Sequence, residues 1–174
     1  MRLAFPHRDI DSFRWLVPFV TGLVAVCLSV MPLHVPGLAV ATPAFVLMAI
    51  YHWTLYRPDL VLPSGVFVLG LLLDLLDGTT YIGISSLTFL AVRGLVLLSR
   101  NRIANQPFPI VWAGFLAIAG AALALEWLTL SVLTLTPLAA RPFMFQLLVT
   151  AAAFPLAGYA LAQLQRGLLG PPVT

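Results

Sequence analysis

Apolar runs, each close to the length that crosses a lipid bilayer, follow one another along almost the whole chain. A helix of about 20 apolar residues spans the hydrocarbon core of a membrane. In lipid every backbone N–H and C=O group must be satisfied within the protein, which for runs of this length means α-helices. The sequence therefore predicts an all-α integral membrane protein, a six-helix transmembrane bundle in which residues 1–174 form one polytopic domain. The expected spans are approximately 15–31, 38–56, 60–76, 81–99, 109–133 and 142–165.

The charged residues are few and scattered. Only 9% of the residues are charged and 61% are hydrophobic, whereas a soluble domain has about 25% charged residues. The mean hydropathy is +1.03. All nine basic residues are arginines, and most of them lie singly between apolar runs. That distribution is typical of topology determinants and not of a phosphate-binding patch, so no nucleic-acid partner is expected.

The arginines also predict the orientation in the membrane. If the N-terminus is cytoplasmic, only Arg141 falls in an outer loop between the spans. An excess of arginine on the cytoplasmic side is the usual pattern, and an even number of spans returns the C-terminus to that side. The arginines then expected on the cytoplasmic side are Arg2, Arg8, Arg14, Arg57, Arg100, Arg102 and Arg166.

Two carboxylates near the outer end of the third run, Asp74 and Asp77, are the first candidates for function. An Asp at the centre of a spanning helix costs roughly 2.5 to 3.5 kcal/mol, so such a residue faces a protein interior, a wet cavity or the membrane edge. The two residues are three apart and share one helical face, where they repel each other. In one reading Asp77 caps the turn that follows and Asp74 reaches up to it. In another, Asp74 accepts hydrogen bonds from a neighbouring helix and fixes the packing. A proton- or cation-coupled site is a third reading.

Arg93 and Glu126 are further polar candidates within the spans. Arg93 lies twelve residues after Tyr81, or roughly 18 Å along a helix, which is too deep for a bridge to Asp74. It is expected to reach the cytoplasmic head groups or to hydrogen-bond within the bundle. Glu126 lies in the outer half of its run, nearer the depth of Asp74, either as a second interior polar group or as an interfacial residue.

Aromatic and small residues have simpler expected roles. Tyr51, Trp53 and Tyr56 are predicted to form an aromatic belt at the inner membrane interface, and His52 is expected to be an interface or loop residue. Alanines recur every fourth position in the fifth run, which predicts close internal helix packing. These alanines are Ala113, Ala117 and Ala121.

Sequence patterns of catalysis and cofactor binding are lacking. The chain has no Gly-x-Ser-x-Gly elbow, no Walker loop, no His-Glu-x-x-His and no dinucleotide fingerprint. Its one cysteine, Cys27, excludes an internal disulfide and a cysteine-based zinc site. No catalytic residue, metal site or cofactor is therefore predicted, and the chain is not expected to be an enzyme.

A core of about forty residues resembles the bacterial rod shape-determining MreD family. Its third run reads Gly-x-x-x-Asp-x-x-x-Gly at Gly70, Asp74 and Gly78, the spacing found in that family. Gly83 follows Gly78 after five residues, where family members often have four. The other matching positions are Tyr51, Trp53, Arg57, Pro58, Leu62 and Leu87.

The resemblance implies a non-catalytic scaffold or regulator of cell-wall elongation in the bacterial cytoplasmic (inner) membrane. MreD-like proteins are thought to act with MreC and to link MreB filaments to the peptidoglycan polymerase RodA and its transpeptidase partner. The family fold looks similar to the S subunits of energy-coupling-factor transporters, so a vitamin-type transporter component is the alternative. A solute site needs a roomy pocket with several convergent polar groups. Beyond its three acidic residues the outer half supplies mainly Thr and Ser, which favours the scaffold.

Overall fold

The computed structural model describes residues 16–31, 42–135 and 139–169, which contain six α-helices, one 3₁₀ turn and no strand. The predicted all-α class is therefore confirmed, and each helix overlaps one of the six apolar runs. Arg2, Arg8, Arg14 and the expected start of the second run at 38–41 lie outside the described residues. The helices are α2 (Leu16–Val30), α3 (Phe45–Tyr56), α4 (Pro63–Asp77), α5 (Ile84–Ile103), α6 (Phe108–Thr134) and α7 (Arg141–Leu169), and the 3₁₀ turn η1 is Pro58–Leu60.

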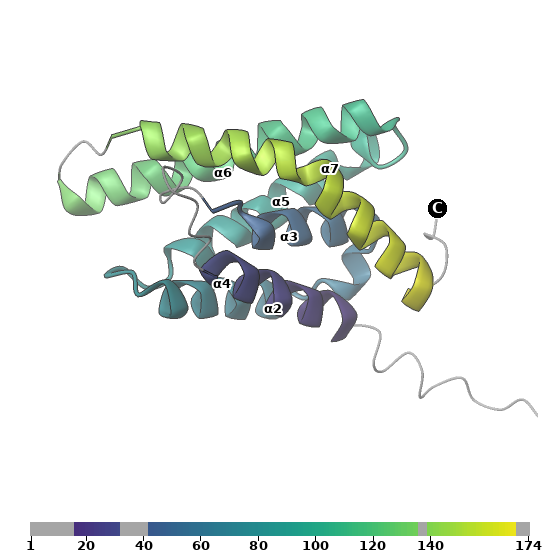
Figure 1. Ribbon diagram of the computed structural model, residues 1–174, viewed down its shortest axis with the longest axis horizontal. Helices are drawn as coiled ribbons and strands as arrows, with labels where there is room; N and C mark the ends of the chain where they lie inside the picture. The colour runs from purple at the N-terminus through teal and green to yellow at the C-terminus, as the bar shows by residue number, and fades with distance from the viewer. Residues whose placement is uncertain (1–15, 32–41, 136–138, 170–174) are drawn as a thin grey trace, which may run out of the picture.

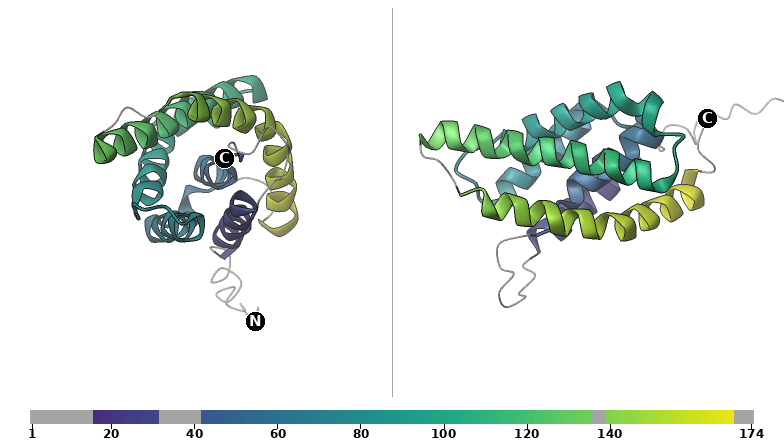
Figure 2. Two further views of the ribbon diagram at one scale, coloured as in Figure 1. Left: turned by 60° about the vertical axis from the view of Figure 1, so that its left-hand side comes forward. Right: turned by 90° about the horizontal axis from the view of Figure 1, so that it is seen from above.

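The centre of the molecule is α3, around which the other helices pack (Figure 1; Figure 2, left). Ten of its twelve residues are buried, from Val46 to Leu55. A helix that is apolar on every side is typical of a protein core or of a membrane span, and here α3 is in the core. The molecule is thus organised around one of its shortest helices.

Aromatic side chains of α3 join it to its neighbours through hydrogen bonds. The Tyr51 hydroxyl donates to the Val111 carbonyl of α6 over 2.9 Å, and the Trp53 Nε1–H donates to Thr21 Oγ1 of α2 over 2.8 Å. Trp53 is only 1% exposed. The predicted aromatic belt is therefore wrong for both residues, because their polar atoms find partners inside the protein and their rings fill its core.

His52 also differs from the expectation of an interface or loop residue. It is buried, and its Nε2 lies 3.1 Å from the Oε1 of Gln165 in α7. Gln165 is buried as well. This pair joins α3 to the second half of α7 in the same way that Tyr51 and Trp53 join it to α6 and α2.

The longest helices are α6 and α7, which run antiparallel along one side of the molecule (Figure 1). Both are long and apolar enough to cross a membrane, whereas α2 and α3 are apolar but shorter than a full span. The second half of α7 bends away from α6 (Figure 1), and Pro155 lies inside this helix. A proline removes one helical hydrogen bond and displaces the preceding turn, which accounts for the bend.

The alanines at every fourth position of α6 do not form the predicted packing face. Ala113, Ala117 and Ala121 are all exposed. The buried face of α6 is instead formed by larger residues together with Ala119 and Ala122. A spacing of four residues identifies a helical face, but only the neighbouring helices decide whether that face points inward.

Candidate functional site

Asp74 lies in the last turn of α4, next to the N-terminus of α5. Its side chain is 2% exposed, and its Oδ2 accepts a hydrogen bond of 2.6 Å from the backbone N–H of Gly83. Gly83 is the N-cap residue of α5, and its φ of 104° lies in the left-handed region that favours glycine. The expected hydrogen bond from Asp74 to a donor of the neighbouring helix is present, and its role in assembly stays a prediction.

The backbone carbonyl of Asp74 closes the end of α4. It accepts the N–H of Gly78, the N–H of Thr79 at 3.3 Å and the Thr79 hydroxyl at 3.2 Å. Gly78 has a φ of 65°. A left-handed glycine after the helix, followed by a bond from the next residue to the carbonyl five residues before that residue, is the Schellman ending of a helix. Asp74 therefore terminates its own helix with its main chain and holds the next helix with its side chain.

Gly70 brings α4 and α5 into close approach one turn earlier. A Cβ added at Gly70 would lie 2.5 Å from the Ser86 nitrogen and 2.9 Å from the Ser85 carbonyl carbon. No side chain fits there without moving a backbone. The Ser86 hydroxyl donates to the Phe67 carbonyl over 3.0 Å across the same crossing. Gly70, Asp74, Gly78 and Gly83 thus form one structural unit, hereafter the α4–α5 corner.

Asp77 has a different place from Asp74 although it shares its helical face. It is the last residue of α4, and its side chain is exposed. The expected capping of the turn by Asp77 is wrong, because the N–H groups of Gly78 and Thr79 bond to the Asp74 carbonyl and not to the Asp77 carboxylate. Its carboxylate makes no hydrogen bond to another of the described residues.

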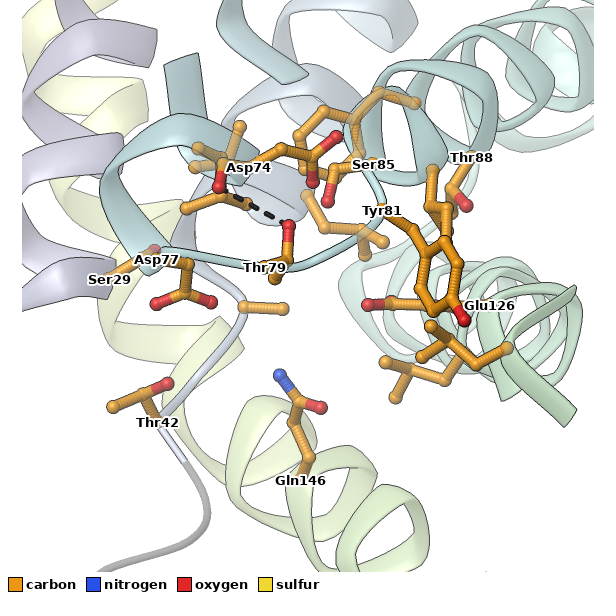
Figure 3. A pocket seen from close by; sticks show the side chains of 18 of the residues that line it. Ser29, Thr42, Asp74, Asp77, Thr79, Tyr81, Ser85, Thr88, Glu126 and Gln146 are labelled. Atoms are coloured by element: carbon orange, nitrogen blue, oxygen red, sulfur yellow. Dashed lines mark hydrogen bonds between the residues drawn. The ribbon is translucent and has the colours of Figure 1, made fainter. Parts of the chain in front are cut away.

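A cavity of about 100 Å³ lies beside the α4–α5 corner and brings together three acidic residues of α4 and α6 (Figure 3). Asp74, Asp77 and Glu126 all line it. In Figure 3, Asp77 and Glu126 lie on opposite sides of the cavity, and the Gln146 amide points into it from α7. Glu126 is half-buried and lines this cavity, and its role as a second interior polar group stays a prediction.

Arg93 of α5 does not line this cavity. Its Nε donates to the Val61 carbonyl, just before α4 begins, over 3.0 Å. Arg100 makes a similar 3.0 Å bond to the carbonyl of Leu55 at the end of α3. Of the two expected placements of Arg93, hydrogen bonding within the bundle is the one observed. Both arginines bind carbonyls at the opposite end of α4 from Asp74.

Sequence reasoning missed most of the uncharged polar residues of the cavity. Ser85 and Thr88 come from the first turns of α5, and Ser29, Thr42, Tyr81 and Gln146 come from four other segments. The spacing of Ser85 and Thr88 by three residues, on the same face of α5, is a signal that could have found these two. No sequence pattern links the other four, because only the packing of α2, α3 and α7 brings them to the cavity.

Among the described residues no group of three His, Cys, Asp or Glu side chains is close enough to hold a metal ion. Two larger cavities, of about 440 and 460 Å³, lie elsewhere, beside the start of α4 and between α3, α6 and α7. Neither contains an acidic residue. The acidic cavity is therefore the place where the candidate residues converge.

Comparison with known proteins gives one match that covers most of the chain. The model of the rod shape-determining protein MreD family matches residues 10–164 of the 174. No solved structure matches the chain. The matched region contains the whole α4–α5 corner and the acidic cavity, and MreD is a family of shape-determining membrane proteins. The chain therefore belongs to the rod shape-determining protein MreD family.

Proposed function

We propose that this chain is a non-catalytic scaffold of the cell-wall elongation machinery in the bacterial inner membrane. In this proposal it acts with an MreC-like protein and links MreB filaments to RodA and its transpeptidase partner. Family membership supports the role in rod shape. The particular partners are those that the family resemblance implies.

The observation that carries the proposal is the bond between the Asp74 carboxylate and the Gly83 N–H. Asp74, the most deeply buried carboxylate among the described residues, is engaged in holding two helices at a fixed crossing. Close backbone approach at Gly70 fixes the same crossing. A rigid pair of intramembrane helices is what a scaffold needs in order to present a constant lateral surface to partners.

The size of the acidic cavity argues against the alternative of a vitamin-type S subunit. That alternative places a solute beneath the outer loops, where the cavity measures about 100 Å³. Small-molecule sites are typically about 300 to 1,000 Å³. The larger cavity between α3, α6 and α7 lies at the other end of α3, beside Tyr56 and Arg166.

The proposal includes six membrane spans with both termini in the cytoplasm. The distribution of charge along the bundle supports this orientation. Arg93 and Arg100 bond to carbonyls at the end of the molecule where α4 begins, and the acidic cavity lies where α4 ends. Arginine is retained on the cytoplasmic side of membrane proteins, so the acidic cavity faces outward.

Copurification from the source bacterium tests the function. The chain carries a C-terminal tag, is extracted in gentle detergent or nanodiscs, and the bound proteins are identified by mass spectrometry. We expect an MreC-like protein together with wall-synthesis enzymes, and we expect depletion of the chain to turn rods into round cells. Recovery of a transporter ATPase module, or of a retained vitamin without wall-synthesis proteins, would refute the scaffold.

A further inference from the structure

We propose that the acidic cavity beside the α4–α5 corner binds the guanidinium or ammonium group of an arginine or lysine side chain supplied by a protein partner. This rests on the proposed function, because it assigns a contact of the scaffold to a particular place and chemistry. In this proposal the basic side chain enters the acidic cavity from the outer face of the membrane.

The charge of the cavity lining is the first argument. Asp74, Asp77 and Glu126 line the cavity, and no Arg, Lys or His does so among the described residues. Carboxylates withdrawn from water are stable only when they are paired or hydrogen-bonded. Only Asp74 has such a partner, the N–H of Gly83. Glu126 is half-buried and has no counter-charge among the described residues, and the exposed Asp77 adds a second negative charge beside the cavity.

Buried hydroxyls give a second and independent argument. Thr88 is 2% exposed and Ser85 is 9% exposed, and both line the cavity. Neither hydroxyl makes a hydrogen bond to another described residue, whereas Ser86, the next residue along, bonds to the Phe67 carbonyl. Buried polar side chains are almost always paired. The Ser85 hydroxyl points toward the cavity (Figure 3), where a ligand would supply the missing partner.

The shape of the cavity selects the kind of cation. The three acidic residues do not form a group that could hold a metal ion among the described residues. A guanidinium has five N–H donors in a planar fork and can bond to separated acceptors at once, and an ammonium has three. Apolar residues of the lining, Phe89, Leu123 and Leu130, provide a wall for the aliphatic stem of such a side chain.

The volume of the cavity favours a side chain over a free solute. About 100 Å³ is well below the roughly 300 to 1,000 Å³ of a typical small-molecule site. That space suits the end of one side chain better than a whole solute of vitamin size. The remainder of the ligand must lie outside the cavity, as the backbone of a docked protein does.

The first test uses the complete chain alone in nanodiscs. The probe is n-propylguanidinium, a mimic of the arginine side chain, and n-propylurea is its uncharged control. We expect saturable binding of the guanidinium only, measured by calorimetry. Glu126→Gln should weaken it by at least about tenfold, or about 1.4 kcal/mol. Asp59→Asn is the control. It removes an exposed carboxylate in η1, just before α4 begins, and should leave binding unchanged.

Several results of this test would overturn the proposal. Equal effects of the guanidinium and the urea would do so, as would unchanged binding by Glu126→Gln. An unchanged melting temperature for Glu126→Gln without ligand shows that the variant is folded. Asp74→Asn is unsuitable here because Asp74 also holds the N-terminus of α5.

The second test uses the complex. Glu126→Gln should lower the yield of the copurified partner at least about tenfold relative to wild type, and Asp59→Asn should not change the yield. Equal partner yields with wild type and Glu126→Gln would exclude the cavity as the docking point while leaving the scaffold function intact. A retained small amine with no protein would show that the cation is not a partner's side chain. If wild type recovers no wall-synthesis protein, the proposed function fails, and the calorimetry still decides whether the cavity binds the cation.

Discussion

The backbone N–H of Gly83 donates a 2.6 Å hydrogen bond to the carboxylate of Asp74, nine residues earlier in the chain. This bond joins the end of one apolar helix to the beginning of the next. It satisfies one of the N–H groups that every helix N-terminus leaves without an intrahelical partner. It also explains how a carboxylate can be kept in an apolar run, since a hydrogen bond to a charged group is among the stronger ones.

Asp74 should therefore contribute more to stability and assembly than Asp77. Hydrogen bonds to charged groups contribute about 1.5 to 3 kcal/mol, so Asp74→Ala should lower the free energy of unfolding by about that amount, and Asp74→Asn by less. Asp77→Asn is the matched control, because Asp77 is exposed at the end of the same helix. Unfolding in mixed detergent micelles measures the stability, and copurification measures assembly. Equal stability, equal partner yields and equal growth for the two Asn variants would contradict this ranking.

Gly70→Ala should be destabilising because the added methyl group meets the Ser86 backbone. Overpacking of this kind costs about 1 to 3 kcal/mol. Gly94→Ala is the control, since a Cβ at Gly94 meets nothing within 4 Å and the residue lies inside α5. In a helix that change stabilises by about 0.5 to 1 kcal/mol. Thermal unfolding of both variants in detergent checks the two signs, and a stabilised Gly70→Ala would disprove the close crossing.

Substitutions at Gly78 measure the cost of a left-handed backbone conformation separately from any cost of packing. A Cβ at Gly78 meets nothing within 4 Å, but its φ of 65° is left-handed. Gly78→Ala should therefore cost about 1 to 2 kcal/mol, the usual penalty of an L side chain in that region. Gly78→Asn should cost less, because Asn tolerates this conformation. The order Gly, Asn, Ala in melting temperature is the expected result, and identical values for Asn and Ala would count against it.

The Tyr51 hydroxyl should contribute measurably to the joining of α3 and α6. Tyr51 is fully buried and bonds to the Val111 carbonyl, so Tyr51→Phe should destabilise the protein by about 1 kcal/mol. Tyr159 is 65% exposed, and Tyr159→Phe should change stability by less than about 0.5 kcal/mol. Chemical or detergent-induced unfolding of the two variants gives the comparison. If Tyr159→Phe were the more damaging change, the assignment of α3 as the core helix would need revision.

The orientation can be tested with reporter fusions. A C-terminal alkaline phosphatase should be inactive, because this enzyme folds in the periplasm and the C-terminus is proposed to be cytoplasmic. A C-terminal green fluorescent protein should be fluorescent for the same reason. The physical basis is the distribution of arginine between the spans. Phosphatase activity without fluorescence would place the C-terminus outside.

Local sequence was enough to predict the helices and to single out Asp74 as a candidate residue. The ends of α4 follow from Pro63 at its start and Gly78 after its end, both of which act through backbone geometry. The expectation that Asp74 would bond to a donor on the neighbouring helix needed only the cost of a charge in an apolar helix. The glycines of the α4–α5 corner were singled out by the resemblance to the MreD family, whose motif lies within a short stretch of sequence.

The burial of each helix face could not be predicted in the same way. Tyr51 and Trp53 carry the amphipathic character of interfacial residues, yet α3 is central and both are core. Ala113, Ala117 and Ala121 have the spacing of a packing face, yet they are exposed. In a chain that is apolar on nearly every side, hydropathy does not distinguish a face that meets protein from one that meets lipid.

The sequence by itself determined the class of the protein, the positions of its helices and the residues of the α4–α5 corner, because apolar length, proline, glycine and isolated charge act locally. Only the tertiary structure decided that α3 is the centre and that Glu126 of α6 and Gln146 of α7 face the same cavity as Asp74. These residues are separated by tens of positions in the chain. Their meeting depends on how whole helices pack, which is a property of all the surfaces together and not of any one segment.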